Sequence, residues 1–341
     1  MKVLVEYSPG AHLDRYIATR LRKNIKGALE LVGTSWVESM FAEPDVVHLI
    51  SPDDESLAHD AKEQGATLVV SALYSEGDPG ARFMNVDSEG FHSLRPKAER
   101  LLKMADMIFV PSEAAETALL TSGLALRSVR VVTPGVNLAR FDAHSDIEKI
   151  VFRRYFRLEE GAPYCLTAGE VDDDERLEAM AELASLVPGI TFFYLLTSKK
   201  GPAKPSYLRR KSKHYPHNLV LSGLVEDDVY RSGVVGALAY LSFASIEADE
   251  LAVLEAMAAK TPVLSLGHPF WSEELTSSKA YRAYPSVERL AKAVESLAQG
   301  KGQPTIIEAY RLARKNSLAV LGRRLVSLYM EAIEGEQKGN P

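Results

Sequence analysis

The chain has 341 residues, of which 46% are hydrophobic and 25% are charged, and its formal net charge is −6. This length accommodates two domains of ordinary size, each with its own hydrophobic core, and the composition is typical of a soluble globular protein. The acidic balance excludes a general electrostatic attraction to nucleic acid.

The cysteine content and the hydrophobic runs indicate the compartment. Cys165 is the only cysteine, so an intramolecular disulfide is excluded and a reducing cytoplasm is favoured. The N-terminal segment MKVLVEYSPG is interrupted too early to be a signal peptide. The longest uncharged run near the centre, residues 232–246, is too short to cross a bilayer. We therefore expect a cytoplasmic protein.

The first elements are a strand over residues 2–7, a turn at Ser8-Pro9-Gly10, and a helix over about 11–26. We interpret the basic side chains of this helix as a solvated face, and contact with an anionic lipid or phosphate surface is the alternative. These side chains are Arg15, Arg20, Arg22, Lys23 and Lys26.

Two strong strands follow at 45–50 and 67–73, with a short helix over 55–64 that the acidic cluster before it caps. His48 lies inside the first of these strands, so we interpret it as a core residue rather than a catalyst. The stretch 74–90 is predicted to be a long polar loop, and long loops are often functional.

The stretch 105–142 contains a buried strand at 105–111, a helix with Ser112 as its N-cap, and another strand at 130–133. The charged segment 142–149 is predicted to be the hinge to a second domain.

The second domain repeats the alternation of strands and helices. Its strands are predicted at 163–168, 190–196, 219–222, 237–243 and 263–266, and its helices at 174–186, 226–233, 251–260, 286–298 and 306–334. Residues 198–205, SKKGPAKP, form a basic loop.

The most informative stretch of the chain is 237–266, where a strand, a polar break, a helix and a second strand make one βαβ unit. Its loop lies at the carboxyl end of a strand, where open α/β sheets place their ligands. Two acids frame this loop, Glu247 and Glu255, which are eight residues apart.

Three motifs carry a family resemblance. They are the E-x7-E pair with the following EAMAAKTPV, the segment VVHLISP, and the stretch ADMIFVPSEAAETALL with VVTPGVNLARF. Together they resemble the family-4 retaining glycosyltransferases. The resemblance implies the GT-B fold, with two doubly wound Rossmann-like α/β domains, a cleft between them and a C-terminal helix that crosses back. The implied domains are 1–142 for the acceptor, 143–309 for the nucleotide sugar, and 310–341 for the bracing helix.

The resemblance also implies an activity, the transfer of a hexose from a UDP- or GDP-sugar to a glycan, lipid or protein acceptor in glycan biosynthesis. The configuration would be retained, and no cofactor or metal would be needed, since no metal-ligand spacing appears. Glu247 would face the sugar as the catalytic residue. Glu255 would accept hydrogen bonds from the ribose and stay partly exposed without ligand. The other assigned residues are Gly169 and Leu251 for the donor, and Gly10 and Asp78 for the acceptor.

The sequence departs from the family where the donor diphosphate binds. The family's G-R-L-x-x-x-K-G places an arginine and a lysine against the phosphates, and here both basic positions hold acids, Glu170 and Glu175. Replacement cations would be Arg176, Lys199 and Lys200. Two alternatives remain open: a degenerate GT-B protein that binds a sugar nucleotide or a partner protein without transfer, and another doubly wound enzyme such as an epimerase.

Overall fold

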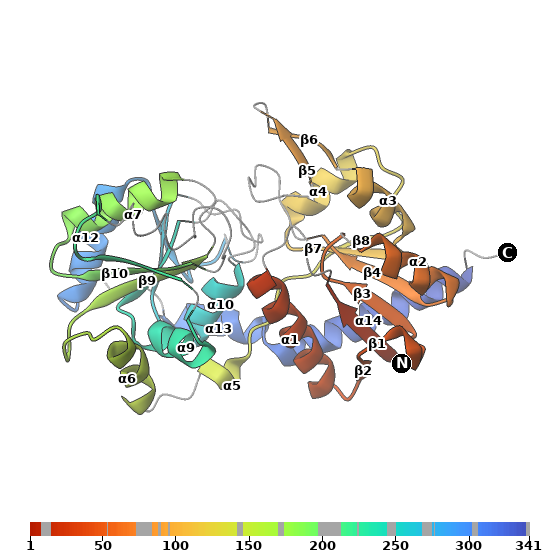
Figure 1. The fold of residues 1–341 in the computed structure, drawn as a ribbon, viewed down its shortest axis with the longest axis horizontal. Coiled ribbons are helices and arrows are strands. Elements are labelled where there is room, and N and C mark those ends of the chain that lie inside the picture. Colours follow the sequence, from red (N-terminus) through yellow and green to blue (C-terminus); the bar gives the residue numbers. More distant parts are fainter. Residues whose placement is uncertain are drawn as a thin grey trace.

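The computed structural model contains two α/β halves, each built on a six-stranded parallel sheet (Figure 1). It describes residues 1–7, 15–52, 54–72, 84–87, 90–94, 96–141, 146–169, 174–196, 213–223, 225–243, 250–267, 275, 277–301 and 306–338. We call 1–141 the N-terminal half and 146–315 the C-terminal half.

The sheet of the N-terminal half has the order β2-β1-β3-β4-β7-β8, and all neighbours are parallel. Every residue of β3, β4 and β7 is buried, because helices cover both faces of the sheet and the strands therefore read as continuous apolar runs. The strands are β1 Lys2–Glu6, β2 Ser35–Val37, β3 Val46–Leu49, β4 Thr67–Ser71, β7 Met107–Val110 and β8 Val129–Val131.

Different helices cover the two faces of this sheet. One face packs against α2 (Glu55–Glu63), α3 (Pro96–Met104) and α4 (Glu113–Thr121). The predicted caps are confirmed, because Asp54 and Ser112 accept backbone N–H bonds at the starts of α2 and α4. The opposite face packs against α1 (Arg15–Leu31) and a helix from the C-terminus. A 3-10 turn (Met40–Ala42) completes this half. The short helix α5 (Leu138–Phe141), at its end in the sequence, packs against the core of the C-terminal half.

The sheet of the C-terminal half has the order β11-β10-β9-β12-β13-β14, again all parallel. This is a doubly wound order whose direction reverses between β9 and β12, the point where such sheets bind ligands. The strands are β9 Tyr164–Gly169, β10 Thr191–Leu196, β11 Leu219–Ser222, β12 Ala239–Ser242, β13 Val263–Leu266 and β14 Arg282–Tyr284. The helices are α6 Asp146–Tyr155, α7 Asp174–Leu186, α9 Asp227–Gly236, α10 Glu250–Ala258, α12 Val287–Ala298 and α13 Ile306–Lys315.

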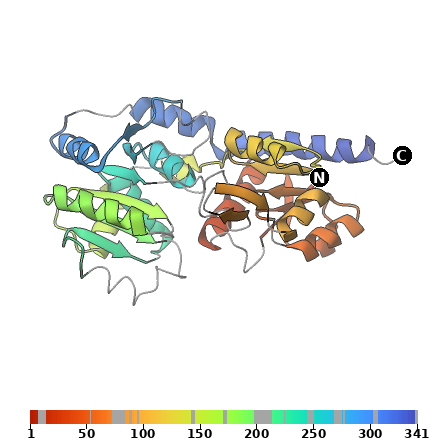
Figure 2. The same ribbon diagram turned by 90° about the horizontal axis from the view of Figure 1, so that it is seen from above.

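The predicted helix 306–334 is two helices, because the chain breaks at Asn316 and Ser317. The first, α13, packs against α10 in the core of the C-terminal half. The second, α14 (Leu318–Lys338), crosses back and lies along the N-terminal half, as Figure 2 shows. The predicted crossing helix is therefore present.

The contact between α14 and α1 is close. A Cβ added at Gly322 of α14 would lie 2.2 Å from the carbonyl oxygen of Ala28 on α1, so only glycine permits this approach. A Cβ at Gly135 would lie 2.7 Å from Leu321. The two glycines therefore allow α14 to pack in direct contact with the backbone of α1 and with the backbone at Gly135.

Other expectations need correction. The predicted hinge 142–149 is in part helical, since α6 begins at Asp146, where the apolar residues that follow give it a face to bury. The predicted loop 74–90 contains β5 (Met84–Asp87), which pairs with β6 (Gly90–Leu94) in an antiparallel hairpin. The strands β2 and β14 and the helix α3 were not expected.

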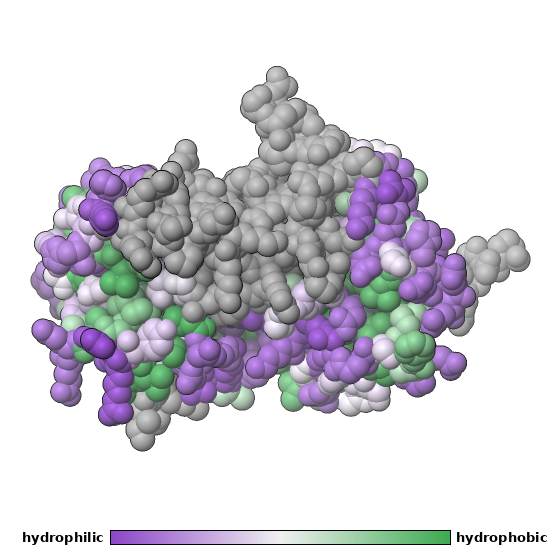
Figure 3. Space-filling model, viewed as in Figure 1, coloured by the Kyte–Doolittle hydropathy of each residue, from purple (hydrophilic) through white to green (hydrophobic). Residues whose placement is uncertain are grey.

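The surface of the described residues is mixed. In Figure 3 hydrophilic residues separate smaller hydrophobic groups over the coloured part of this face. Among the residues that the structure describes, no helix combines the length and the hydropathy that a membrane span requires.

Candidate functional site

The stretch 237–266, with its E-x7-E pair, forms the predicted βαβ unit. β12 leads through residues 244–249, which lie outside the described residues, into α10, and β13 follows. Residues 251–259 are all buried, as expected of a helix that is apolar all round. Glu255 is the one acid within this buried run.

Glu255 is only 3% exposed, so the expectation that it stays partly exposed without ligand is wrong. Its carboxylate is enclosed by the N-terminal half and by α9. Arg20 of α1 forms an ion pair with its Oε2 atom, and the hydroxyl of Tyr230 donates to the same oxygen at 2.9 Å. The buried acid therefore joins the two halves of the molecule.

A second arginine lies on the other side of this carboxylate. Arg140 of α5 places its Nη1 atom 3.9 Å from Oε1 of Glu255, and it also pairs with Asp227 at the start of α9. The Arg20 guanidinium lies 5.0 Å from the centre of the Tyr230 ring. Two guanidiniums and one phenol thus converge on the acid.

Two of the assigned donor residues, Gly169 and Leu251, are described in the structure. Gly169 is the last residue of β9 and is buried, and β9 pairs with β12 at the point where the strand order reverses. Leu251, one helical turn before Glu255, is 3% exposed and lines a cavity between the halves. Their roles in binding a donor remain predictions.

The other assigned residues lie wholly or partly outside the described residues. Arg176 lies on α7, but its side chain is outside the described residues. The same holds for the whole of Glu247, Lys199, Lys200, Gly10 and Asp78. Of the two acids at the phosphate positions, Glu170 is not described and Glu175 is described only as part of α7.

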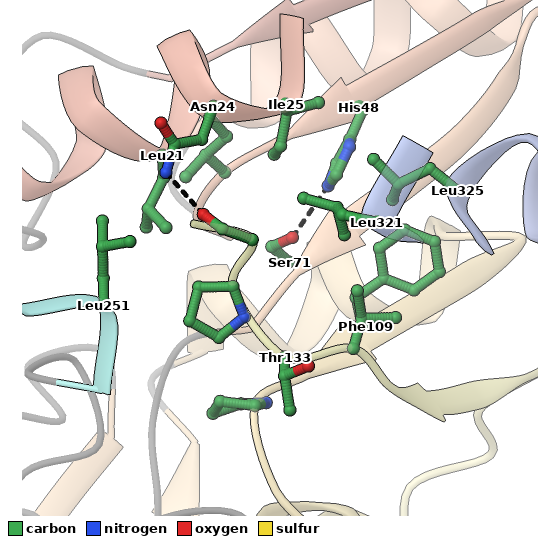
Figure 4. Close-up of a pocket in the computed structure, with 15 residues that line it drawn as sticks. Leu21, Asn24, Ile25, His48, Ser71, Phe109, Thr133, Leu251, Leu321 and Leu325 are labelled. Carbon is green, nitrogen blue, oxygen red and sulfur yellow. Dashed lines mark hydrogen bonds between the residues drawn. The ribbon is translucent and has the colours of Figure 1, made fainter. Parts of the chain in front are cut away.

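A cavity of about 60 Å³ lies at the carboxyl ends of the strands of the N-terminal half (Figure 4). At one side Asn24 donates to the carbonyl oxygen of Gly135 at 2.6 Å. Most of the lining is apolar. It consists of Leu21 and Ile25 from α1, Ile50 after β3, Phe109 from β7, Leu251 from α10, and Leu321 and Leu325 from α14.

The polar floor of this cavity is His48 with Ser71. His48 is fully buried; its Nε2 atom lies 2.7 Å from the Ser71 hydroxyl, and its Nδ1 atom lies 2.7 Å from the hydroxyl of Tyr329 on α14. Burial lowers the pKa of His48 from 6.5 to about 3, so the ring is neutral at ordinary pH. Both ring nitrogens are engaged within the fold, which confirms the interpretation of His48 as a core residue.

Three basic side chains of α1, those of Arg20, Arg22 and Lys26, form ion pairs within the fold. Arg22 pairs with Glu6 and Glu38, and Lys26 pairs with Glu38. Arg20 reaches the C-terminal half, as described above. The interpretation of these three side chains as a solvated face is therefore wrong.

Sequence reasoning missed the partners of Glu255. Arg20 was assigned to a basic face, and neither Arg140 nor Tyr230 was singled out. Ion pairs that join residues far apart in the chain leave no local pattern, so only the fold reveals them. Among the described residues, no three metal-ligating side chains come together.

Known proteins resemble this chain along its whole length, although no family model matches it. The processive diacylglycerol alpha-glucosyltransferase of Acholeplasma laidlawii is 21% identical over 334 residues, which are 98% of this chain and 99% of that relative.

Solved structures share the fold. HepE of Anabaena in complex with UDP-glucose matches with a TM-score of 0.68 and 12% identity, over 97% of this chain and 100% of that one. Sucrose-phosphate synthase from Thermosynechococcus elongatus gives 0.72 and 13%, over 97% and 98%. WaaG, a glycosyltransferase involved in lipopolysaccharide biosynthesis, gives 0.62 and 16%, over 96% and 99%. The predicted GT-B fold is thereby confirmed, and the chain resembles glycosyltransferases in both sequence and architecture.

Proposed function

We propose that the protein is a glycosyltransferase that moves a hexose from a UDP- or GDP-sugar to a lipid acceptor of the diacylglycerol type. One observation carries this proposal, the alignment with a diacylglycerol glucosyltransferase over 99% of that relative's length. The alignment spans both halves of the chain, so it supports a donor site and an acceptor site together.

The junction of the two halves supports the donor side of the proposal. Glu255 follows β12, whose pairing with β9 marks the reversal of strand order, and a carboxylate there has two oxygens to offer to a vicinal diol. Glu247, eight residues earlier, is the candidate for contact with the sugar. HepE, which shares the fold, was solved with UDP-glucose bound.

The cavity in the N-terminal half supports a lipid acceptor. About 60 Å³ is room for several water molecules, but the lining is mostly aliphatic and aromatic. An alkyl chain gains roughly 0.8 kcal/mol for each methylene that it buries, whereas a sugar hydroxyl in the same place would lose its hydrogen bonds to water.

The proposed reaction retains the configuration of the sugar and uses no metal. The bond between the anomeric carbon and the diphosphate breaks, a bond from the same carbon to the acceptor oxygen forms, and the acceptor's proton passes to the departing phosphate. UDP-glucose carries an α-linked sugar, and the relative's name specifies an α product, so retention is the simplest stereochemical course. The departing diphosphate requires cations close to it.

The test is a transfer assay with the full chain. Purified protein is incubated with UDP-glucose or GDP-glucose and vesicles that contain diacylglycerol, and glucolipid is detected by mass spectrometry. We expect product from one donor, and Glu247→Gln should abolish it. The matched control Glu295→Gln, on an exposed position of α12, should leave it unchanged.

Other outcomes would overturn the proposal. Transfer to water-soluble glycans but not to diacylglycerol would refute the lipid acceptor. Binding of the nucleotide sugar without transfer or donor hydrolysis would establish the degenerate alternative. Membrane contact through the helix 11–26 remains a prediction, and Arg22 and Lys26 on that helix are already paired with acids.

A further inference from the structure

The ion pair between Arg20 and Glu255 is unusual because it joins the two halves inside the protein. The side chain of Arg20 is 12% exposed and that of Glu255 is 4% exposed. Removing both charges from water costs several kcal/mol per ion, and a pair of apolar residues would often be at least as stable. Stability alone is therefore a weak reason for this pair.

The position of the pair suggests another reason. The inference rests on the proposed function, in which Glu255 accepts hydrogen bonds from the donor's ribose. A guanidinium and a pair of ribose hydroxyls both donate to carboxylate oxygens, so they compete for the same atoms. Oε2 of Glu255 already receives Arg20 and the Tyr230 hydroxyl. A ribose whose two hydroxyls bind both carboxylate oxygens must therefore displace Arg20 from Oε2 or share that oxygen with it.

The displaced side chain would have a second anion near it. In a nucleotide sugar the ribose is joined to the diphosphate through a single methylene, so a guanidinium at the ribose carboxylate is within a side chain's reach of phosphate oxygens. Arginine is suited to this role, because its planar fork donates two parallel hydrogen bonds to phosphate. The two C-terminal positions at which the family resemblance implies phosphate-binding cations hold Glu170 and Glu175 in this chain.

We propose that Arg20 is a diphosphate-binding residue, supplied by the N-terminal half, which exchanges Glu255 for the donor's diphosphate when the nucleotide binds. Glu255 is then released to the ribose, and Tyr230 keeps one of its oxygens occupied throughout. Without donor, Arg20 holds the carboxylate in a neutralised pair. With donor, it provides the positive charge that the C-terminal positions lack.

This exchange predicts that loss of Arg20 has different effects on the affinities for uridine and for UDP. Uridine has the ribose but no phosphate, so it competes with Arg20 and gains nothing in return. UDP has both groups, so it recovers the lost ion pair as contacts to phosphate. Removing Arg20 should therefore weaken UDP binding while leaving uridine binding unchanged or stronger.

The experiment is isothermal titration of the full chain with uridine, UDP, guanosine and GDP. Arg20→Gln should lower the affinity for the diphosphate of the accepted base by about tenfold to a hundredfold, the equivalent of one or two charge-assisted hydrogen bonds. Affinity for the nucleoside should stay equal or rise. Arg22→Gln is the matched control: it lies on the same helix but pairs with Glu6 and Glu38, and it should change neither affinity.

Each other result overturns the inference in a distinguishable way. Equal losses for nucleoside and diphosphate would mean that Arg20 only supports the fold, and gains for both would mean that it only blocks the ribose site. Failure of the wild type to bind any of the four ligands would overturn the proposed function as well. If Arg20→Gln does not fold, Arg20→Lys decides the question: we expect a selective loss of diphosphate affinity, because lysine lacks the fork, and equal affinities would refute the role.

Discussion

The buried histidine of the N-terminal half makes the stability of the protein depend on pH. The pKa of His48 in the folded protein is about 3, lowered from 6.5 by burial. Between these two values the unfolded chain takes up a proton that the folded chain cannot accept. Lowering the pH therefore favours unfolding, and the stability associated with neutral His48 is fully present above pH 6.5 and is lost as the pH falls toward 3.

The size of the effect follows from the same two values. Each pH unit below 6.5 costs about 1.4 kcal/mol, so the unfolding free energy should fall by about 2.5 kcal/mol between pH 7 and pH 4.5 from this residue alone. Other groups titrate in the same range, so the comparison that isolates His48 is with His48→Gln. That variant should be less stable at pH 7, because two hydroxyls lose their present partner, but it should lack this component of the acid sensitivity.

The assay is urea unfolding at pH 7.0, 5.5 and 4.5 for wild type and variant. We expect the difference in unfolding free energy between them to shrink by about 2.5 kcal/mol over this range. His59→Gln is the control, because His59 is exposed on α2, and its curve should follow that of the wild type. Parallel loss of stability in wild type and His48→Gln would refute the reasoning, since it would mean that His48 is not held neutral in the fold.

Three other predictions concern packing and burial. Glu255→Gln should lower the unfolding free energy by about 3 kcal/mol, because it leaves a largely buried arginine without its acid; Asp227→Asn, at a more exposed pair, should cost less than about 1 kcal/mol in the same denaturant titration. Gly322→Ala should destabilise the protein by about 1–3 kcal/mol, because the new methyl group would collide with α1. The control Gly335→Ala has open space around it and should stabilise the protein by up to about 1 kcal/mol. An equal effect of both variants on the melting temperature would contradict the close packing of Gly322. Burial raises the pKa of the Cys165 thiol to about 12, so a thiol reagent at pH 8 should label it only at the rate of unfolding, and rapid labelling of the native protein would show that the strand is accessible.

Much of the fold could be predicted because both sheets are parallel and buried. Strands such as β4 and β7 are continuous apolar runs between polar turns, and such runs are visible in the sequence. The edge strands β2 and β14 are three residues long and partly exposed, so they carry too little pattern to be recognised. The hairpin of β5 and β6 was missed because its residues follow a glycine-rich polar stretch that is typical of a loop.

The candidate site was less predictable than the fold. The local motif placed Glu255 on a helix after a strand, since the spacing of apolar residues determines that placement. Its burial and its partners depend on how α1 and α5 approach α10, and these elements are far from it in the chain. The sequence shows that Arg20 is a cation, but it contains no signal for which anion the side chain meets.

The return of α14 to the N-terminal half also determines when that half can be completed during synthesis. One face of its sheet is covered by Leu318, Leu321, Leu325 and Tyr329 of α14. Until residues 318–338 have left the ribosome, this face has only α1 over it, and the buried side chains there would be exposed to water. Many multidomain chains finish their N-terminal domain first. Here the half that is translated first is the last to have its core covered. A nascent chain of about 300 residues should therefore present an apolar surface to chaperones at the ribosome exit.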